Sequence, residues 1–188
     1  MPTHLTPQCC DPQGGLTERW PDRRHFLQTL ALGGSAAGLA VLFPRTRAYA
    51  AGQTEAVLLS CMDYRLVTAT GHYMASQGLK EKYDHLILAG AALGALTDKF
   101  PSWNQTFWDH LGVAIDLHKV HKVMVLDHRD CGAYKVILGE DFAKDPAKEK
   151  AIHTTQLQRL GTMVKAKHPT LDVELGLMAL DGTVERIV

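Results

Sequence analysis

Three short apolar segments constrain the fold of this chain more than any other feature. They cover residues 56–60, 85–89 and 123–126, and apolar side chains follow one another in each instead of alternating with polar ones. That pattern is typical of parallel strands covered on both faces. Between the second and third segments, residues 102–119 carry apolar side chains at spacings of three and four, which predicts a helix with one buried face. This order predicts an α/β fold: a mostly parallel central β-sheet flanked by helices, with right-handed crossovers.

The C-terminal third of the sequence predicts another helix and a strand hairpin. The helix is expected over residues 147–167, because apolar residues recur on one side of it, namely Leu157, Leu160 and Val164. Residues 171–180 and 184–188 have the composition of strands, and the Asp-Gly pair at Asp181 between them is a turn signal. The last two segments are therefore expected to pair as a C-terminal hairpin.

Two polar motifs follow predicted strands. C-M-D-Y-R begins at Cys61, after the first strand, and H-R-D-C-G begins at His128, after the third. Open parallel sheets bind ligands beyond the carboxyl ends of their strands, so the two motifs should meet at one edge. Two thiolates and an imidazole with one position left open suit a catalytic zinc, and they are the wrong ligands for Mg2+ or Ca2+. We therefore predict a Zn2+ site formed by Cys61, His128 and Cys131.

Two other interpretations of these cysteines stay open at this point. Cys61 and Cys131 could form a disulfide, which is common in exported proteins. Alternatively, the zinc could be structural, with Asp63 as a fourth ligand that closes the site. The acidic, basic and imidazole groups that accompany the cysteines favour a metal over a disulfide. Asp130, between two of the ligands, is interpreted as a turn residue or as an acceptor behind them.

Asp63 and Arg65 are the candidate catalytic residues. If the first strand continued past Cys61, the period-two alternation would place both on the same side as Cys61. An aspartate held by an arginine beside a metal can accept a hydrogen bond from metal-bound water, or it can occupy the fourth position itself. His72 and Tyr73, which follow the first motif, are candidate proton relays.

The N-terminal segment, residues 1–50, has the pattern of a twin-arginine export signal. Arg23-Arg24 precede a weakly apolar stretch over residues 29–43, and Ala48-Tyr49-Ala50 is an Ala-x-Ala cleavage site. A membrane anchor is the alternative, but the glycines make the apolar stretch too short and too weakly hydrophobic for a membrane span. We expect cleavage after Ala50, no stable membrane association afterwards, and a periplasmic location. Cys9 and Cys10 would then be lost, leaving the two motif cysteines as the only thiols.

Composition bounds residues 51–188 to one nearly neutral domain. The chain has 20 basic and 20 acidic side chains, of which five and three lie in residues 1–50, so 15 basic and 17 acidic ones remain. A domain of this length can bury a real core without disulfides. The sequence holds no basic patch or charge run of the kind that binds nucleic acid, so no nucleic-acid partner is expected.

The spacing C-x-D-x-R followed by H-x-x-C-G resembles the β-class carbonic anhydrases, and the similarity extends over residues 55–188. The resemblance implies that Cys61, His128 and Cys131 are zinc ligands. It also implies that Asp63 and Arg65 form a catalytic dyad, which orients zinc-bound water or hydroxide for attack on carbon dioxide, the small-molecule substrate, to give bicarbonate. It further implies a homodimer or higher homo-oligomer. Because two thiolates donate more charge than two imidazoles, activity should rise into the alkaline range.

The chain departs from the pattern of that family in three places. The N-terminal helical arm of many members is nearly absent, with five residues between Ala50 and the first strand. Members commonly carry Arg-Asn-Ala-Gly where this chain has Ile87-Leu88-Ala89-Gly90, and a His-Gly pair near the terminal strand is replaced by Leu175-Gly176. The apolar Ile87-Leu88 pair could favour carbonyl sulfide or carbon disulfide as the hydrolysed substrate. A zinc-binding protein without turnover is the remaining alternative.

Overall fold

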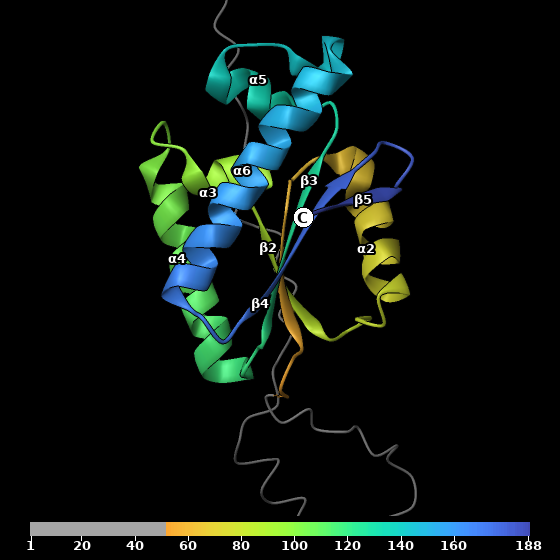
Figure 1. Cartoon of the computed structure of the whole chain (residues 1–188). Coiled ribbons are helices and arrows are strands. Elements are labelled where there is room, and N and C mark those ends of the chain that lie inside the picture. The colour runs from red at the N-terminus through yellow and green to blue at the C-terminus, as the bar shows by residue number, and fades with distance from the viewer. Residues whose placement is uncertain (1–51) are drawn as a thin grey trace, which may run out of the picture. The chain divides into compact units, whose positions relative to one another are not determined.

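A five-stranded sheet forms the centre of the computed structural model, which describes residues 52–188 (Figure 1). The predicted export signal and its cleavage site lie outside the described residues. The sheet order is β2-β1-β3-β4-β5; the first four strands are parallel, and β5 runs antiparallel to β4. These strands are β1 (Ala56–Ser60), β2 (Tyr83–Ile87), β3 (Lys122–His128), β4 (Asp172–Met178) and β5 (Val184–Ile187). The predicted mostly parallel sheet and C-terminal hairpin are confirmed.

Helices cover the sheet unequally. In Figure 1, α3, α4 and α6 lie on one face and α2 lies on the other. Since the chain passes from β1 to β2 and then back across β1 to β3, right-handed crossovers require helices on opposite faces. The helical segments are η1 (Tyr64–Leu66), α2 (Val67–Ser76), α3 (Ala91–Leu96), α4 (Pro101–His118), α5 (Gly132–Leu138), η2 (Phe142–Lys144) and α6 (Pro146–Lys167).

Strand β1 shows why the apolar segments are continuous. Its Val57 and Leu59 belong to the core under α3, α4 and α6, whereas Ala56 and Leu58 belong to the core under α2. All five residues of the strand are buried. Alternate side chains of a strand point to opposite faces, so a strand covered on both sides needs apolar residues at every position.

The two long helices lie within one residue of their predicted ranges. α4 buries Phe107 and Leu111, as its spacing predicts. α6 begins behind Asp145, whose carboxylate accepts hydrogen bonds from the backbone N–H groups of Ala147 and Lys148, each at 3.1 Å. Within residues 52–188, no helix is both long and apolar enough to span a membrane.

Several strand boundaries differ from the sequence prediction by one or two residues, and two of them bear on the site. β2 ends at Ile87, before the predicted residue 89, because the chain turns at Gly90, whose φ is 77°. β3 runs on to His128, two residues beyond the predicted end. His128 is therefore the last residue of its strand and is fixed by the sheet itself.

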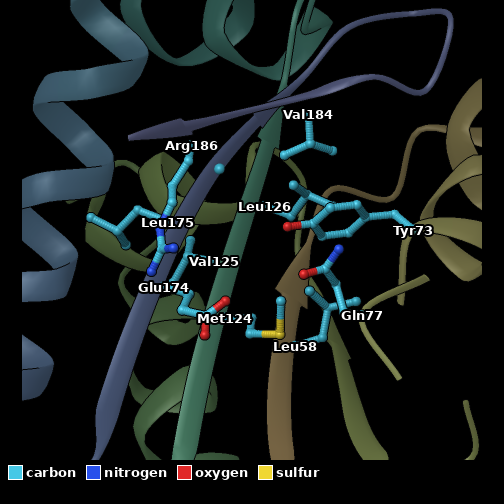
Figure 2. A pocket seen from close by; sticks show the side chains of 11 residues that line it. Leu58, Tyr73, Gln77, Met124, Val125, Leu126, Glu174, Leu175, Val184 and Arg186 are labelled. Carbon is cyan, nitrogen blue, oxygen red and sulfur yellow. The ribbon is translucent and has the colours of Figure 1, made fainter. Parts of the chain in front are cut away.

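A small cavity lies between α2 and strands β3 to β5 (Figure 2). Its volume is about 70 Å³. Tyr73 of α2 and Gln77, the residue directly after this helix, face Glu174 and Arg186 of the strands across an apolar floor. Of the candidate site residues named from the sequence, Tyr73 lines this cavity, whereas the predicted metal ligands and the candidate catalytic residues do not.

Candidate metal centre

The candidate ligands meet where the strand order of the sheet reverses. β1 and β3 are neighbours, with Ser60 paired to Leu126, and the chain leaves them toward opposite sides of the sheet. Cys61 is the first residue after β1, His128 is the last residue of β3, and Cys131 is the N-cap residue of α5. A crevice at such a reversal is the usual ligand site of an open parallel sheet.

Cys61, His128 and Cys131 form a compact trio of ligand atoms, all within 4.8 Å of one another. His128 and Cys131 are buried, and Cys61 is half-buried. The two sulfur atoms are 3.9 Å apart and both thiols are free, whereas a disulfide would require about 2.05 Å. The trio therefore has the donor set and the spacing to hold a soft divalent metal such as zinc.

The ring of His128 is already oriented for metal binding. Its Nδ1–H donates to the carbonyl oxygen of Arg129 at 2.8 Å, which leaves the lone pair on Nε2 in the neutral ring. Nε2 is buried and has no hydrogen-bond partner among residues 52–188. A buried nitrogen without a partner is costly, and a metal ion beside the two sulfur atoms would satisfy it.

The two thiols share one proton unequally. The hydrogen bond with Cys131 is the largest of the effects that lower the pKa of Cys61 to about 4. His128 and the N–H of Gly90, which donates to the Cys61 sulfur at 3.3 Å, also contribute to this lowered pKa. The same hydrogen bond and burial raise the pKa of Cys131 above its usual range. Cys61 is therefore the more readily ionised of the two thiols. Binding of a metal through both sulfur atoms would release the proton of Cys131.

Asp63 and Arg65 lie beside the trio, but a turn brings them there and not a continued strand. β1 ends at Ser60, so the strand does not continue past Cys61 and the alternation that would have aligned them with Cys61 does not apply. Asp63 instead caps η1 by accepting a hydrogen bond from the backbone N–H of Arg65 at 3.0 Å. The Arg65 guanidinium donates to both carboxylate oxygens, at 3.0 and 2.8 Å. This pairing lowers the pKa of Asp63 to about 2, so it is a carboxylate at neutral pH.

Asp63 stands close to the position where a metal would bind. Its Oδ2 is 3.8 Å from Nε2 of His128, yet within residues 52–188 it is not a member of the trio of mutually close ligand atoms. The carboxylate is therefore near enough to interact with a fourth ligand and is held by Arg65.

An apolar pocket of about 440 Å³ opens beside Cys61 and Asp63. Its wall includes Phe100 and Trp103, whose rings stack with centroids 4.3 Å apart, and the aliphatic side chains of α5. Ala89 reaches this wall, whereas Ile87 and Leu88 do not. His72 is exposed on α2 and does not line the pocket. The Ile87-Leu88 pair thus does not line this pocket.

A buried polar network behind the ligands was missed by the sequence analysis. Asp127 is 1% exposed and accepts hydrogen bonds from the Tyr134 hydroxyl at 2.5 Å, His153 Nδ1 at 2.8 Å and the Ala92 N–H at 2.9 Å. These donors belong to α5, α6 and α3, so one carboxylate ties three helices to the strand that carries His128. The signal was present: His153 lies four residues before the buried Leu157 on α6.

Comparisons with known proteins place the fold and sequence in context. An uncharacterized protein of Rickettsia conorii is 37% identical over 135 residues, which is 72% of this chain and 73% of that protein. An uncharacterized protein of Rickettsia bellii is 36% identical over 135 residues, covering 72% of this chain and 82% of that protein.

Solved structures are similar at lower identity. The β-carbonic anhydrase isoform I of Trichomonas vaginalis gives a TM-score of 0.49 at 20% identity, over 88% of this chain and 92% of that one. A chain from the structures of two tetrameric β-carbonic anhydrases of Sordaria macrospora gives a TM-score of 0.49 at 11% identity, over 88% of this chain and 87% of that one. The sequence model of a family described as "Putative carbonic anhydrase" matches residues 51–187. The chain therefore belongs to that family.

Proposed function

We propose that this domain is a zinc-dependent carbonic anhydrase, which interconverts carbon dioxide and bicarbonate. The observation that carries the proposal is the trio Cys61, His128 and Cys131, with its unpartnered imidazole nitrogen, next to the Asp63–Arg65 pair. Membership of the family supports the same reading. The donor set leaves one coordination position for a reacting molecule, as catalytic zinc sites require.

The roles of the protein residues follow from their contacts. Bound zinc would supply the Lewis acidity that makes hydroxide available from water near neutral pH. Asp63, kept ionised by Arg65, accepts a hydrogen bond from the reacting water and so fixes its orientation. With a pKa of about 2, Asp63 is too weak a base to take up the proton at neutral pH, so its role is to orient the water, and the proton leaves to solvent or buffer.

The pocket beside the trio suits a small uncharged substrate. Phe100, Trp103, Val136 and Ile137 give it an apolar wall that accepts carbon dioxide without the desolvation penalty of a charged molecule. Carbonyl sulfide is a small linear molecule like carbon dioxide, so it should be assayed in parallel. The Ile87-Leu88 pair, which suggested this substrate, does not line the pocket.

The experiment is metal analysis of purified protein together with stopped-flow carbon dioxide hydration. We expect about one zinc per chain, and a loss of about 100-fold in hydration rate for Asp63→Ala with zinc retained. Asp116→Ala, at an exposed position of α4, is the matched control and should hydrate carbon dioxide like the wild type.

Two outcomes would contradict the proposal in different ways. Bound zinc without hydration would mean a zinc-binding protein without turnover or, if carbonyl sulfide is consumed, a hydrolase of that gas. A chain that binds no zinc would remove the metal site altogether. The homo-oligomer and the periplasmic location stay predictions from the sequence.

A further inference from the structure

The Arg65 side chain is held by two acidic residues from different parts of the chain. One is Asp63, two residues away; the other is Asp130, in the turn between His128 and Cys131. Arg65 Nη1 donates to the Asp130 carboxylate at 2.7 Å, and Nη2 donates to the Asp130 carbonyl oxygen at 2.9 Å. With the two hydrogen bonds to Asp63, the guanidinium makes four hydrogen bonds in all, and these fix its position and orientation.

Asp130 is itself fixed from behind by α6. Its φ is 56°, in the left-handed region that few residues other than glycine adopt. Its N–H donates to the carboxylate of Glu149 at 2.5 Å, and Glu149 is only 5% exposed. Arg129 donates to the second oxygen of Glu149 at 3.3 Å. The turn therefore presents both acceptors of Asp130 to Arg65 from a rigid base.

This arrangement bears on what Asp63 does. Its Oδ2 is close enough to Nε2 of His128 to turn toward a metal and occupy the fourth position. Arg65 opposes that movement by holding both carboxylate oxygens. Arg65 can resist only if it is anchored elsewhere, and Asp130 is its other anchor.

We infer that Asp130 is a positioning residue that anchors Arg65 and so keeps Asp63 out of the fourth coordination position. The inference rests on the proposed metal site and adds a residue that decides whether the site is open. Asp130 touches neither substrate nor metal in this role. Its effect passes through Arg65 to Asp63.

The test uses the visible absorption spectrum of the full chain loaded with Co2+ in place of zinc, which reports on the coordinating atoms. Asp130→Gly removes the carboxylate and tolerates the left-handed backbone. We expect it to change the cobalt spectrum as Asp63 joins the metal, and to lower kcat/KM for hydration by about 10-fold to 100-fold at neutral pH. Asp130→Asn keeps a side-chain oxygen for Arg65 and should retain the wild-type spectrum.

Two controls separate the role of Asp130 from a general effect on folding. Asp141→Gly removes a surface carboxylate that pairs with Lys135 and should leave the spectrum unchanged. In an Asp63→Ala background, Asp130→Gly should have no further effect, because no carboxylate is left to move. An unchanged spectrum in Asp130→Gly, or an equal change without Asp63, would overturn this inference. Cobalt binding without hydration in the wild type would instead overturn only the proposed function.

Discussion

A single hydrogen bond at His128 decides which ring nitrogen is free to act as a ligand. Because Nδ1 donates to the carbonyl of Arg129, Nε2 is the nitrogen that faces the two sulfur atoms. The acceptor is a backbone atom of the next residue, so this orientation does not depend on a second side chain. Substitution of Arg129 would therefore keep the ring orientation, although it would remove the contact with Glu149.

The Asp63–Arg65 pair makes a testable pH prediction. The pKa of Asp63 is lowered to about 2 by Arg65, so the pair stabilises the fold above the unfolded-state pKa of about 3.9 and loses this contribution as the pH falls toward 2. In metal-free protein, the difference in unfolding free energy between wild type and Asp63→Asn should shrink between about pH 5 and pH 2. Urea unfolding at each pH measures it. A difference that does not vary over this range would contradict the lowered pKa.

The sequence indicates which residues gather at the candidate site better than how they get there. Cys61, His128 and Cys131 follow from two motifs at strand ends, which the parallel sheet brings together. Asp63 and Arg65 also lie beside these ligands, but a one-turn helix brings them there. The alternation of side chains along a strand could not predict that turn. The contacts of Asp130 and Glu149 join positions 19 residues apart, and no local pattern encodes such a pairing.

Among the helices, two glycines give opposite predictions for the same substitution. A Cβ on Gly94 of α3 would collide with the carbonyl oxygen of Ala89, next to the Gly90 that donates to Cys61. Gly94→Ala should therefore lower the unfolding free energy by about 1–3 kcal/mol. A Cβ on Gly71 of α2 meets nothing within 4 Å, so Gly71→Ala should raise it by about 0.5–1 kcal/mol. Denaturant unfolding of both variants measures these changes in unfolding free energy. Changes of the same sign in the two variants would contradict the packing described for α3.

Elements with a clear period were predictable, and those without one were not. α4 and α6 carry one apolar face each, and their ranges were found within one residue. α3 is A-A-L-G-A-L, and all six residues are buried, so it has no polar face and no helical period to detect. β2 was displaced by two residues because the apolar run continues past the strand into the turn at Gly90.

At the scale of the whole domain, metal removal should lower stability. A ligand that binds only the folded state stabilises it by about 2.7 kcal/mol when its free concentration is 100 times Kd. Thermal unfolding of the zinc-loaded protein should therefore occur several degrees above that of chelator-treated protein, with recovery when zinc is restored. The Cys131→Ser variant should unfold at the same temperature with and without zinc. A zinc-dependent shift of equal size in that variant would place the stabilising metal elsewhere.

The order of segments along the chain also governs when a metal can be captured. Cys61 and Cys131 are 70 residues apart, with β2, α3 and α4 between them, whereas His128 and Cys131 share one turn. Contacts between distant segments carry a large loop-closure cost and form slowly. An ion that arrives before β1 has docked against β3 meets only two ligands. Tight metal uptake is therefore expected only after β1 has paired with β3.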